Sequence, residues 1–258
     1  MWDIPRRLSP LLFCLALTPL SGELHNTTYG YKISNAVIDH LFYMDDLKLY
    51  AKDDSDLEGL LQTVKRFSDD IGMQFGLSKC AKATFKRGKL VSATNIHLDL
   101  NTTIRELEQN DTYKYLGIDE GDGIQHSLMK ERLRKEYYRR VRAILKSELN
   151  SKNRIEAINT LAVPVVQYSF NIINWNMADI RRMDVKTRKL LTNNRMHHPK
   201  ADIDRLYLPR RDGGRGMIQL ELAYKTTTIG LNEYLHLSSD WMMKLVKNHE
   251  TSKSFILP

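Results

Sequence analysis

The chain has 258 residues, 42% hydrophobic and 27% charged, which is typical of a folded protein and excludes a largely disordered chain or a coiled coil. Its two cysteines, Cys14 and Cys80, exclude a disulfide framework and a cysteine-based zinc ribbon. Lys and Arg outnumber Asp and Glu by 39 to 31, and the net charge of +8 favours a polyanionic partner, although a solvated basic surface accounts for the same excess.

The first segment has two interpretations. Two arginines at 6–7 precede an apolar run, Leu8 to Leu20, and the small residues Ser21 and Gly22 follow, an order typical of a secretory signal peptide. Pro10 and Pro19 interrupt the run, whereas the apolar core of a signal usually forms an unbroken helix. No run reaches the ~20 apolar residues that a membrane span needs. A secreted glycoprotein would also fit three Asn-x-Thr sequons: Asn26, Asn101 and Asn110.

The most informative segment is Leu41 to Ala51, which reads LFYMDDLKLYA. Residues with high β-propensity flank Asp45 and Asp46 on both sides, and aspartate favours turns, so the segment predicts a hairpin with the two aspartates at its tip. Adjacent carboxylates repel each other unless a cation neutralises them, and hard divalent cations prefer carboxylate oxygens. The alternative is a surface turn that happens to hold two aspartates.

Two strings carry a family resemblance. FYMDD resembles the Tyr-x-Asp-Asp hairpin in the palm of reverse transcriptases, and Leu8 to Ser21 resembles the helix just upstream of it in reverse transcriptases of non-LTR retrotransposons. The resemblance implies that Asp45 and Asp46 are catalytic and bind Mg²⁺ or Mn²⁺, because this family transfers nucleotides with two metal ions. It also implies nucleotide or template contacts for four residues: Ser9, Pro10, Tyr43 and Met44.

The next segments continue the resemblance. Ser55 to Met73 predicts a helix that starts with a Ser55–Glu58 capping box and ends near Gly72. Gly76 to Phe85 predicts a short strand and resembles the next palm motif, which implies that Lys79 or Lys82 lies near the incoming triphosphate; a solvated strand face is the alternative. Tyr113 to Ile118, YKYLGI, resembles the primer-grip hairpin, which implies that two residues lie close to the primer end: Leu116 and Gly117.

The C-terminal half is rich in basic helices. Ser127 to Asn150 predicts a helix with eight Lys and Arg against three Glu, and two further helices are predicted at 152–163, breaking at Pro164, and at 178–194. The alternative for each of these helices is a charged face that is only solvated. Following a palm-like hairpin, they fit a thumb that tracks a duplex backbone, with contacts that read charge and not sequence. The residues assigned to backbone contact are Arg132, Arg139, Arg140 and Arg142.

Asp204 to Met217 resembles a connector that follows the thumb in some non-LTR elements. Its glycines and arginines could also approach a phosphate backbone, but no P-loop pattern is present. His197 and His198 could suggest a metal site, yet no further Cys or His lies at ligand spacing nearby, so a surface turn before Pro199 is the better interpretation.

Together these features predict an α+β fold: a partial polymerase palm at 1–122, a helical thumb-like region at 123–200 and a connector-like region at 201–258. The resemblance implies an RNA template and a DNA primer as partners. The lack of a long apolar run predicts no membrane partner. In the family another metal-binding aspartate comes from an earlier strand, and only a few residues precede Leu8 here. We therefore expect a reverse transcriptase fragment that binds metal weakly and is inactive alone. The alternatives are a non-catalytic nucleic-acid-binding module and a secreted glycoprotein.

Overall fold

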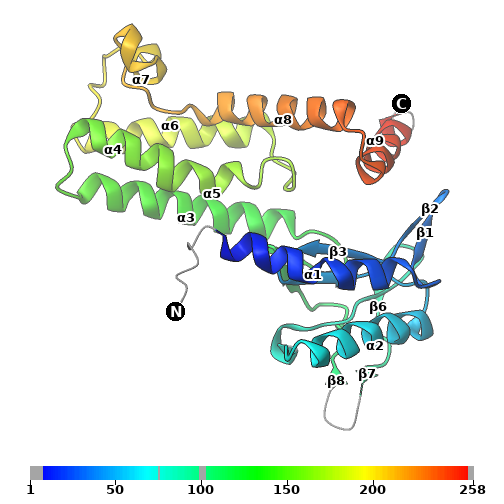
Figure 1. Ribbon diagram of the computed structural model, residues 1–258. Coiled ribbons are helices and arrows are strands. Elements are labelled where there is room, and N and C mark those ends of the chain that lie inside the picture. Colours follow the sequence, from blue (N-terminus) through cyan, green and yellow to red (C-terminus); the bar gives the residue numbers. More distant parts are fainter. Residues whose placement is uncertain (1–7, 75, 99–102, 255–258) are drawn as a thin grey trace. The chain divides into compact units, whose positions relative to one another are not determined.

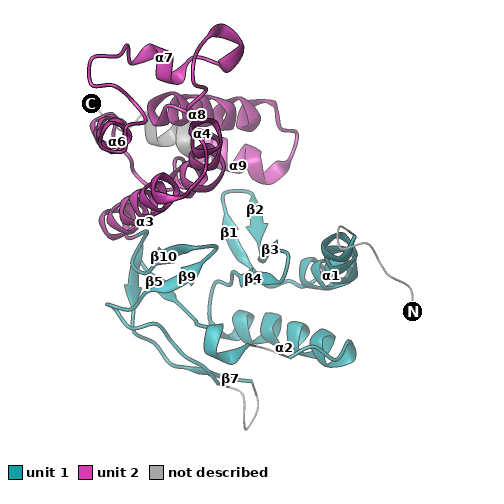
Figure 2. Cartoon of the chain, turned by 90° about the vertical axis from the view of Figure 1, so that its left-hand side faces the viewer, with its two compact units in different colours: residues 1–124 teal, residues 125–258 magenta. Residues whose placement is uncertain are grey.

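The computed structural model describes residues 8–74, 76–98 and 103–254. The chain divides into two compact units, residues 1–124 and residues 125–258 (Figure 2). The described part of the first unit combines helices with short strands, and the regular secondary structure described in the second is helical. This mixture agrees with the predicted α+β class. No helix within the described residues is long and apolar enough to cross a membrane.

Two helices, α1 (Ser9–His25) and α2 (Asp54–Asp70), form the core of the first unit (Figure 1). Their buried residues Leu20, Leu24, Leu60 and Val64 pack together. The described strands form five two-stranded antiparallel sheets: β1 (Tyr31–Ile33) with β2 (Ala36–Ile38), β3 (His40–Tyr43) with β4 (Asp46–Leu49), β5 (Thr84–Lys86) with β6 (Lys89–Val91), β7 (Ile96–His97) with β8 (Thr103–Ile104), and β9 (Tyr113–Tyr115) with β10 (Ile118–Glu120).

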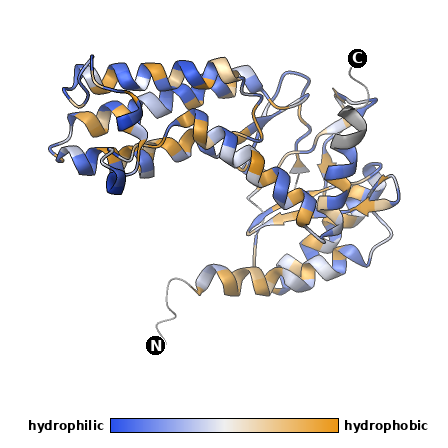
Figure 3. Ribbon diagram, turned by 90° about the horizontal axis from the view of Figure 1, so that it is seen from above, coloured by the Kyte–Doolittle hydropathy of each residue, from blue (hydrophilic) through white to orange (hydrophobic). Residues whose placement is uncertain are grey.

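Helix α1 confirms the predicted helix over the N-terminal apolar run. Pro10 lies in its first turn, where the missing N–H costs nothing, and the helix continues past Pro19. Leu20 and Leu24 are buried, but Leu11 and Leu15 are each 66% exposed. Figure 3 shows this apolar N-terminal half in hydrophobic colours. The exposed Cys14 lies in the same half.

Two local predictions in the first unit were wrong. Helix α2 is capped by Asp53, whose carboxylate accepts a 3.0 Å hydrogen bond from the Asp56 N–H, and not by the Ser55–Glu58 box, because Asp53 already has the extended backbone that a cap needs. Residues 76–85 are not one strand. A 3₁₀ turn, η1 (Leu77–Lys79), comes first, because local hydrogen bonds to Gly76 and Leu77 replace strand pairing.

The second unit contains seven α-helices within its described residues (Figure 1). They are α3 (His126–Lys146), α4 (Ser151–Ala157), α5 (Val163–Gln167), α6 (Met177–Asn193), α7 (Asp204–Tyr207), α8 (Leu220–Leu237) and α9 (Trp241–Ser254). The predicted break at Pro164 was wrong. A π-helical turn, Ile158–Ala162, leads directly into α5, where Pro164 occupies the first turn and removes no needed donor.

Candidate functional site

Asp45 and Asp46 lie at the tip of the β3–β4 hairpin, as predicted. Tyr43 pairs with Asp46, so Met44 and Asp45 form a two-residue turn, in which Met44 has φ +55°. A positive φ at the first turn position matches the twist of antiparallel strands. All four residues at this tip are exposed, and neither aspartate has an ion pair with a described residue. The hairpin therefore presents two carboxylates to solvent.

A second hairpin, β9–β10, lies against the first. The Lys48 ammonium on β4 is 2.6 Å from the Glu120 carboxylate on β10 and 4.6 Å from the centre of the Tyr115 ring on β9. The connecting turn is Leu116–Gly117, with φ +45° and +83°, the backbone of a type I′ turn. The predicted primer-grip residues therefore form the tip of a hairpin that contacts the Asp45–Asp46 hairpin through Lys48.

The phenol pKa of both tyrosines on β9 is raised by burial and by nearby charges, including that of Asp46 on the first hairpin. Burial is the largest cause that raises the pKa of the Tyr113 phenol, and the carboxylates of Asp46 and Glu120 also raise it. Burial likewise raises the pKa of Tyr115; Lys48 opposes the rise, and Asp46 adds to it.

The two candidate lysines differ in their surroundings. Lys79 is exposed at the end of η1, and its backbone carbonyl accepts a 2.7 Å hydrogen bond from the Tyr113 hydroxyl, which joins η1 to β9. The Lys82 ammonium is buried, 2.8 Å from Asp54 and 3.3 Å from Glu106. Only Lys79 therefore combines an exposed side chain with a link to the second hairpin.

The predicted residues at the start of α1 lie farther along the chain from this cluster. Ser9 and Pro10 are exposed. The Ser21 hydroxyl lies 2.7 Å from the His40 Nε2 and so ties α1 to the start of β3. Twelve helical residues, about 18 Å, separate Ser9 from that contact. A template role for Ser9 and Pro10 stays a prediction.

The donor set at the hairpin tip fits a hard divalent cation. Mg²⁺ is commonly held by one or two carboxylates, with water and substrate phosphates completing six oxygen ligands. Asp45 and Asp46 supply two such carboxylates. No group of three or more His, Cys, Asp or Glu side chains that could hold a metal ion occurs within the described residues.

The four arginines assigned to backbone contact do not form one group. Glu136 binds two of them, with Arg139 Nε at 2.6 Å and Arg140 Nε at 2.7 Å, and these hydrogen bonds lower the pKa of Glu136 to about 2. Arg142 lies instead 6.0 Å from the ring centre of Tyr138, and Arg132 is exposed. The Lys186 ammonium of α6 also lies 4.4 Å from the centre of the Tyr138 ring. The sequence marks the helix at 178–194 as basic, but only the packing of α3 on α6 brings Lys186 beside Tyr138.

The connector-like segment is held by residues of its own unit. Asn159 donates a 2.8 Å hydrogen bond to the Gly216 carbonyl and accepts one of 2.9 Å from the Ile218 N–H. The Arg215 guanidinium donates to the Met196 carbonyl. A Cβ at Gly214 would collide with the Leu208 backbone, so this glycine serves a close approach within the loop.

Comparisons with known proteins agree with the motifs. Residues 6–119 match the family model of reverse transcriptase (RNA-dependent DNA polymerase). The chain is 24% identical over 220 residues to the Retrovirus-related Pol polyprotein from type-2 retrotransposable element R2DM of Drosophila melanogaster. That match covers 83% of this chain and 20% of the polyprotein, so the chain spans about a fifth of its relative's length. These matches confirm the resemblance of the chain to the reverse transcriptases of non-LTR retrotransposons, and the family match itself lies in residues 6–119.

Proposed function

We propose that the first unit is part of the palm of an RNA-directed DNA polymerase and that Asp45 and Asp46 serve nucleotidyl transfer. The observation that supports this is the meeting of three motif-bearing segments. Lys48 joins the aspartate hairpin to the Leu116–Gly117 hairpin through Glu120, and the Tyr113 hydroxyl joins that second hairpin to the Lys79 segment. Residues far apart in sequence are thus gathered as a polymerase palm requires.

Each residue has a distinct proposed role. Asp45 and Asp46 hold Mg²⁺ or Mn²⁺, which, when bound, activates the primer hydroxyl and stabilises charge at the phosphorus. The exposed Lys79 ammonium is placed to attract the triphosphate of the incoming nucleotide, whereas the Lys82 ammonium is bound by Asp54 and Glu106. Tyr43 and Met44 flank the metal ligands on the nucleotide side.

The turn of the second hairpin would position the primer. Leu116 and Gly117 form a tight turn that presents backbone to a bound strand, and Lys48 sets the distance between this turn and the aspartates. Lys48 is a positioning residue that the motifs did not reveal. In the second unit we assign residues 123–200 to a thumb and residues 201–258 to a connector, with RNA template and DNA primer as partners.

Metal binding can be measured without activity. The electron paramagnetic resonance signal of free Mn²⁺ should fall when the chain is added, with weak affinity. Asp45→Asn/Asp46→Asn should abolish this effect, whereas Asp69→Asn/Asp70→Asn, an adjacent pair at the end of α2, should not. Equal loss in both variants would contradict a specific site at the hairpin.

We also propose that this 258-residue chain has no appreciable polymerase activity alone, because the family holds its metal ions with a further aspartate beside the hairpin pair and the described residues contain no group of three side chains that could bind a metal ion. The test is primer extension on an RNA template with Mg²⁺ or Mn²⁺. Extension by the chain that disappears in Asp45→Asn would overturn the proposed inactivity while supporting the assigned chemistry.

A further inference from the structure

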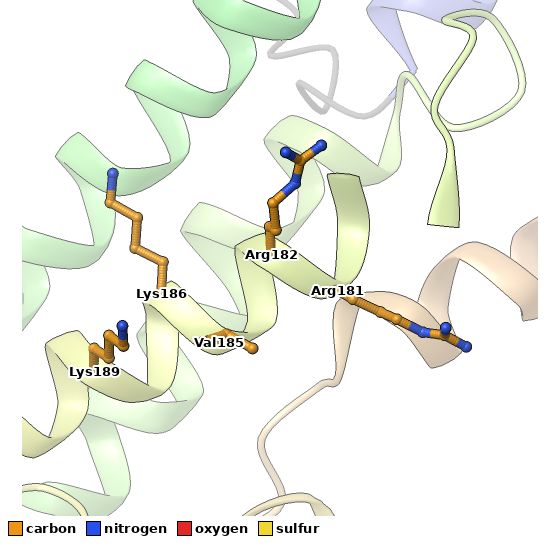
Figure 4. Close-up of a pocket in the computed structure, with 5 residues that line it drawn as sticks. All are labelled: Arg181, Arg182, Val185, Lys186 and Lys189. Atoms are coloured by element: carbon orange, nitrogen blue, oxygen red, sulfur yellow. The ribbon is translucent and has the colours of Figure 1, made fainter. Parts of the chain in front are cut away.

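Two hollows of the second unit differ in their lining. The larger, about 530 Å³, is lined by five residues of α6: Arg181, Arg182, Val185, Lys186 and Lys189. Figure 4 shows Arg182 and Lys186 on the same side of α6, whereas Arg181 points away from them. Because every lining residue belongs to one helix of the proposed thumb, this hollow is part of the thumb surface and not a separate site.

The smaller hollow, about 220 Å³, lies between three segments that follow α6. They are the segment from 197 to 202, helix α7, and the loop after the 3₁₀ turn η3 (Arg210–Asp212). We call this hollow the α7 pocket and define it by its polar and charged residues: His197, His198, Asp202, Arg205 and Arg215. The pocket thus gathers two imidazoles, two guanidiniums and one carboxylate.

Hydrogen bonds hold the walls of the α7 pocket together. The Arg215 N–H donates to the Arg205 carbonyl at 2.9 Å, and the Met217 N–H donates to the Leu206 carbonyl at 3.1 Å, so the loop after η3 lies along α7. The Arg215 guanidinium donates to the Met196 carbonyl and joins that loop to the segment after α6. The pocket is therefore formed before any ligand binds.

His197 lines the pocket with a nearly buried ring. The residue is 9% exposed, and its imidazole makes no hydrogen bond with a described residue. Buried polar groups normally have a hydrogen-bond partner, and a buried imidazole without one is costly. Burial lowers the pKa of this imidazole, and the charges of Arg215, Arg188 and His198 lower it further. These effects favour the neutral ring, which keeps one N–H donor.

His198 supplies a second donor to the pocket. Its Nδ1 accepts a 3.1 Å hydrogen bond from the Lys200 N–H. In the neutral imidazole one nitrogen accepts and the other donates, so the proton of His198 lies on Nε2. The ring therefore keeps an N–H that its own turn does not use.

The charges of the pocket leave a positive excess. Arg205 and Arg215 donate to backbone carbonyls, and neither forms an ion pair with a described residue. The carboxylate in the lining, Asp202, accepts a 3.0 Å hydrogen bond from the Asp204 N–H. Two guanidiniums against one carboxylate give a formal excess of one positive charge before either histidine takes up a proton.

We propose that the α7 pocket binds a small phosphate dianion, supplied either as inorganic phosphate or as the terminal phosphate of a nucleotide. Guanidinium groups donate forked hydrogen bonds that match phosphate oxygens. The N–H groups of His197 and His198 add donors, and the ligand gives the His197 ring the partner that it lacks. The site requires no metal ion and no part of the Asp45–Asp46 hairpin.

The chemistry of the pocket favours a terminal phosphate over the diester backbone of a nucleic acid. A phosphate monoester carries a charge of about −1.5 to −2 near pH 7 and has three strong acceptor oxygens. A diester carries one negative charge and has fewer free oxygens, so it leaves more of these donors without a partner. The nearly buried position of His197 also keeps its ring out of reach of a continuous strand.

Two arginines of the same region form a matched pair for the test. Arg205 lines the pocket on α7, whereas Arg211 lies in η3 outside the lining, with its side chain 85% exposed. Both are exposed residues, and Arg205→Gln and Arg211→Gln each remove one positive charge. A difference between the two variants therefore reports the position of the charge and not its amount.

The experiment is nuclear magnetic resonance of the histidine Cε1–H groups of the full chain, at pH 7 in EDTA. The His197 signal is identified by its absence in His197→Gln. Inorganic phosphate and adenosine 5′-monophosphate should shift this signal, and the tighter of the two identifies the source of the phosphate. Adenylyl-(3′→5′)-adenosine, which has only a diester, should not shift it.

The variants test which charges hold the ligand. Arg205→Gln should raise the Kd for inorganic phosphate about tenfold, the size expected for one lost charge-assisted hydrogen bond. Arg211→Gln should leave that Kd unchanged. Asp45→Asn/Asp46→Asn should also leave it unchanged, which separates this site from the polymerase assignment.

The same signal gives a second readout through its titration with pH. Sulfate, which stays a dianion over the whole range, should raise the pKa of His197, because a nearby negative charge favours the protonated ring. That rise opposes the lowering by Arg215, Arg188 and His198. Three outcomes would overturn the proposal: an unchanged pKa in sulfate, equal losses of affinity in the two arginine variants, and binding of the diester as tight as that of phosphate.

Discussion

The Lys48 ammonium lies 2.6 Å from the Glu120 carboxylate, although 72 residues separate them in the sequence. This ion pair joins the hairpin that carries the candidate metal ligands to the hairpin that carries the candidate primer contact. Both side chains are about one third exposed. The pair therefore contributes less through its own energy than through the alignment of the two turns.

A double-mutant cycle measures that pair. Lys48→Met and Glu120→Gln should each destabilise the chain slightly, with a coupling energy of about 0.5–1 kcal/mol, the range of partly exposed ion pairs. Urea unfolding of the four proteins gives the coupling, which should shrink in 1 M salt because of screening. A coupling of zero at low salt would show that the two hairpins are held together by other contacts.

The turn at Leu116–Gly117 depends on the backbone freedom of glycine. Gly117 has φ +83°, and no atom lies within 4 Å of the position that a Cβ would take, so Gly117→Ala should cost about 1 kcal/mol through backbone conformation alone. Gly230, within α8, also has open space around it but an ordinary helical backbone, so Gly230→Ala should stabilise by about 0.5–1 kcal/mol. In thermal unfolding the same added methyl group should lower the melting temperature in Gly117→Ala and raise it in Gly230→Ala.

Substitution of Lys82 should destabilise the chain, whereas substitution of Lys79 should not. Lys82→Met leaves Glu106 buried without its cation, so it should destabilise the chain by about 3 kcal/mol or more. Adding Glu106→Gln should restore part of that loss. Lys79→Met changes an exposed side chain and should leave stability within about 0.5 kcal/mol of wild type. Urea unfolding that ranks the two variants the other way would contradict a structural role for Lys82.

Acid should weaken the contact between α6 and α8. Hydrogen bonds from Arg181 and Lys225 lower the pKa of Glu221 to about 2. A lowered pKa means that the unfolded chain binds the proton more tightly, so this contribution is present above about pH 4.5 and is lost as the pH falls towards 2. Glu221→Gln should flatten the stability profile in that window by about 1 kcal/mol at most, because the cations are exposed.

The control for this pH profile is Glu156→Gln, an exposed glutamate on α4 in the same unit. Its profile should follow that of the wild-type chain. Thermal unfolding between pH 2 and pH 7 compares the three proteins. If Glu221→Gln loses as much stability between pH 7 and pH 2 as the wild-type chain does, the pairs with Arg181 and Lys225 contribute nothing to folding.

The sequence predicted best where local chemistry decides the structure. The aspartate hairpin followed from β-propensity around a turn-forming pair, and α3 and α6 followed from helical periodicity. The start of α2 was predicted wrongly because Asp53 and Ser55 can both cap a helix. The helix break at Pro164 was predicted wrongly because packing determines the backbone there, and a π-helical turn leads into Pro164.

The parts of the site that escaped prediction are all long-range. The Lys48–Glu120 pair and the contact of Lys186 with the Tyr138 ring join residues that no spacing rule connects, because their proximity is set by how hairpins and helices pack. The regular spacing from Lys130 to Arg142 was a readable signal of one face. It could not reveal that α6 would add cations to that face.

The two thiols differ in a way that gives the chain a built-in labelling position. The nucleophile in alkylation is the thiolate, and burial raises the pKa of Cys80, whose Sγ also donates to the Gly76 carbonyl. Cys14 is exposed among the leucines of α1. A brief maleimide reaction near neutral pH should therefore attach one environment-sensitive dye to α1 in the wild-type chain. The emission wavelength of that dye would shift if another molecule covered the exposed leucines.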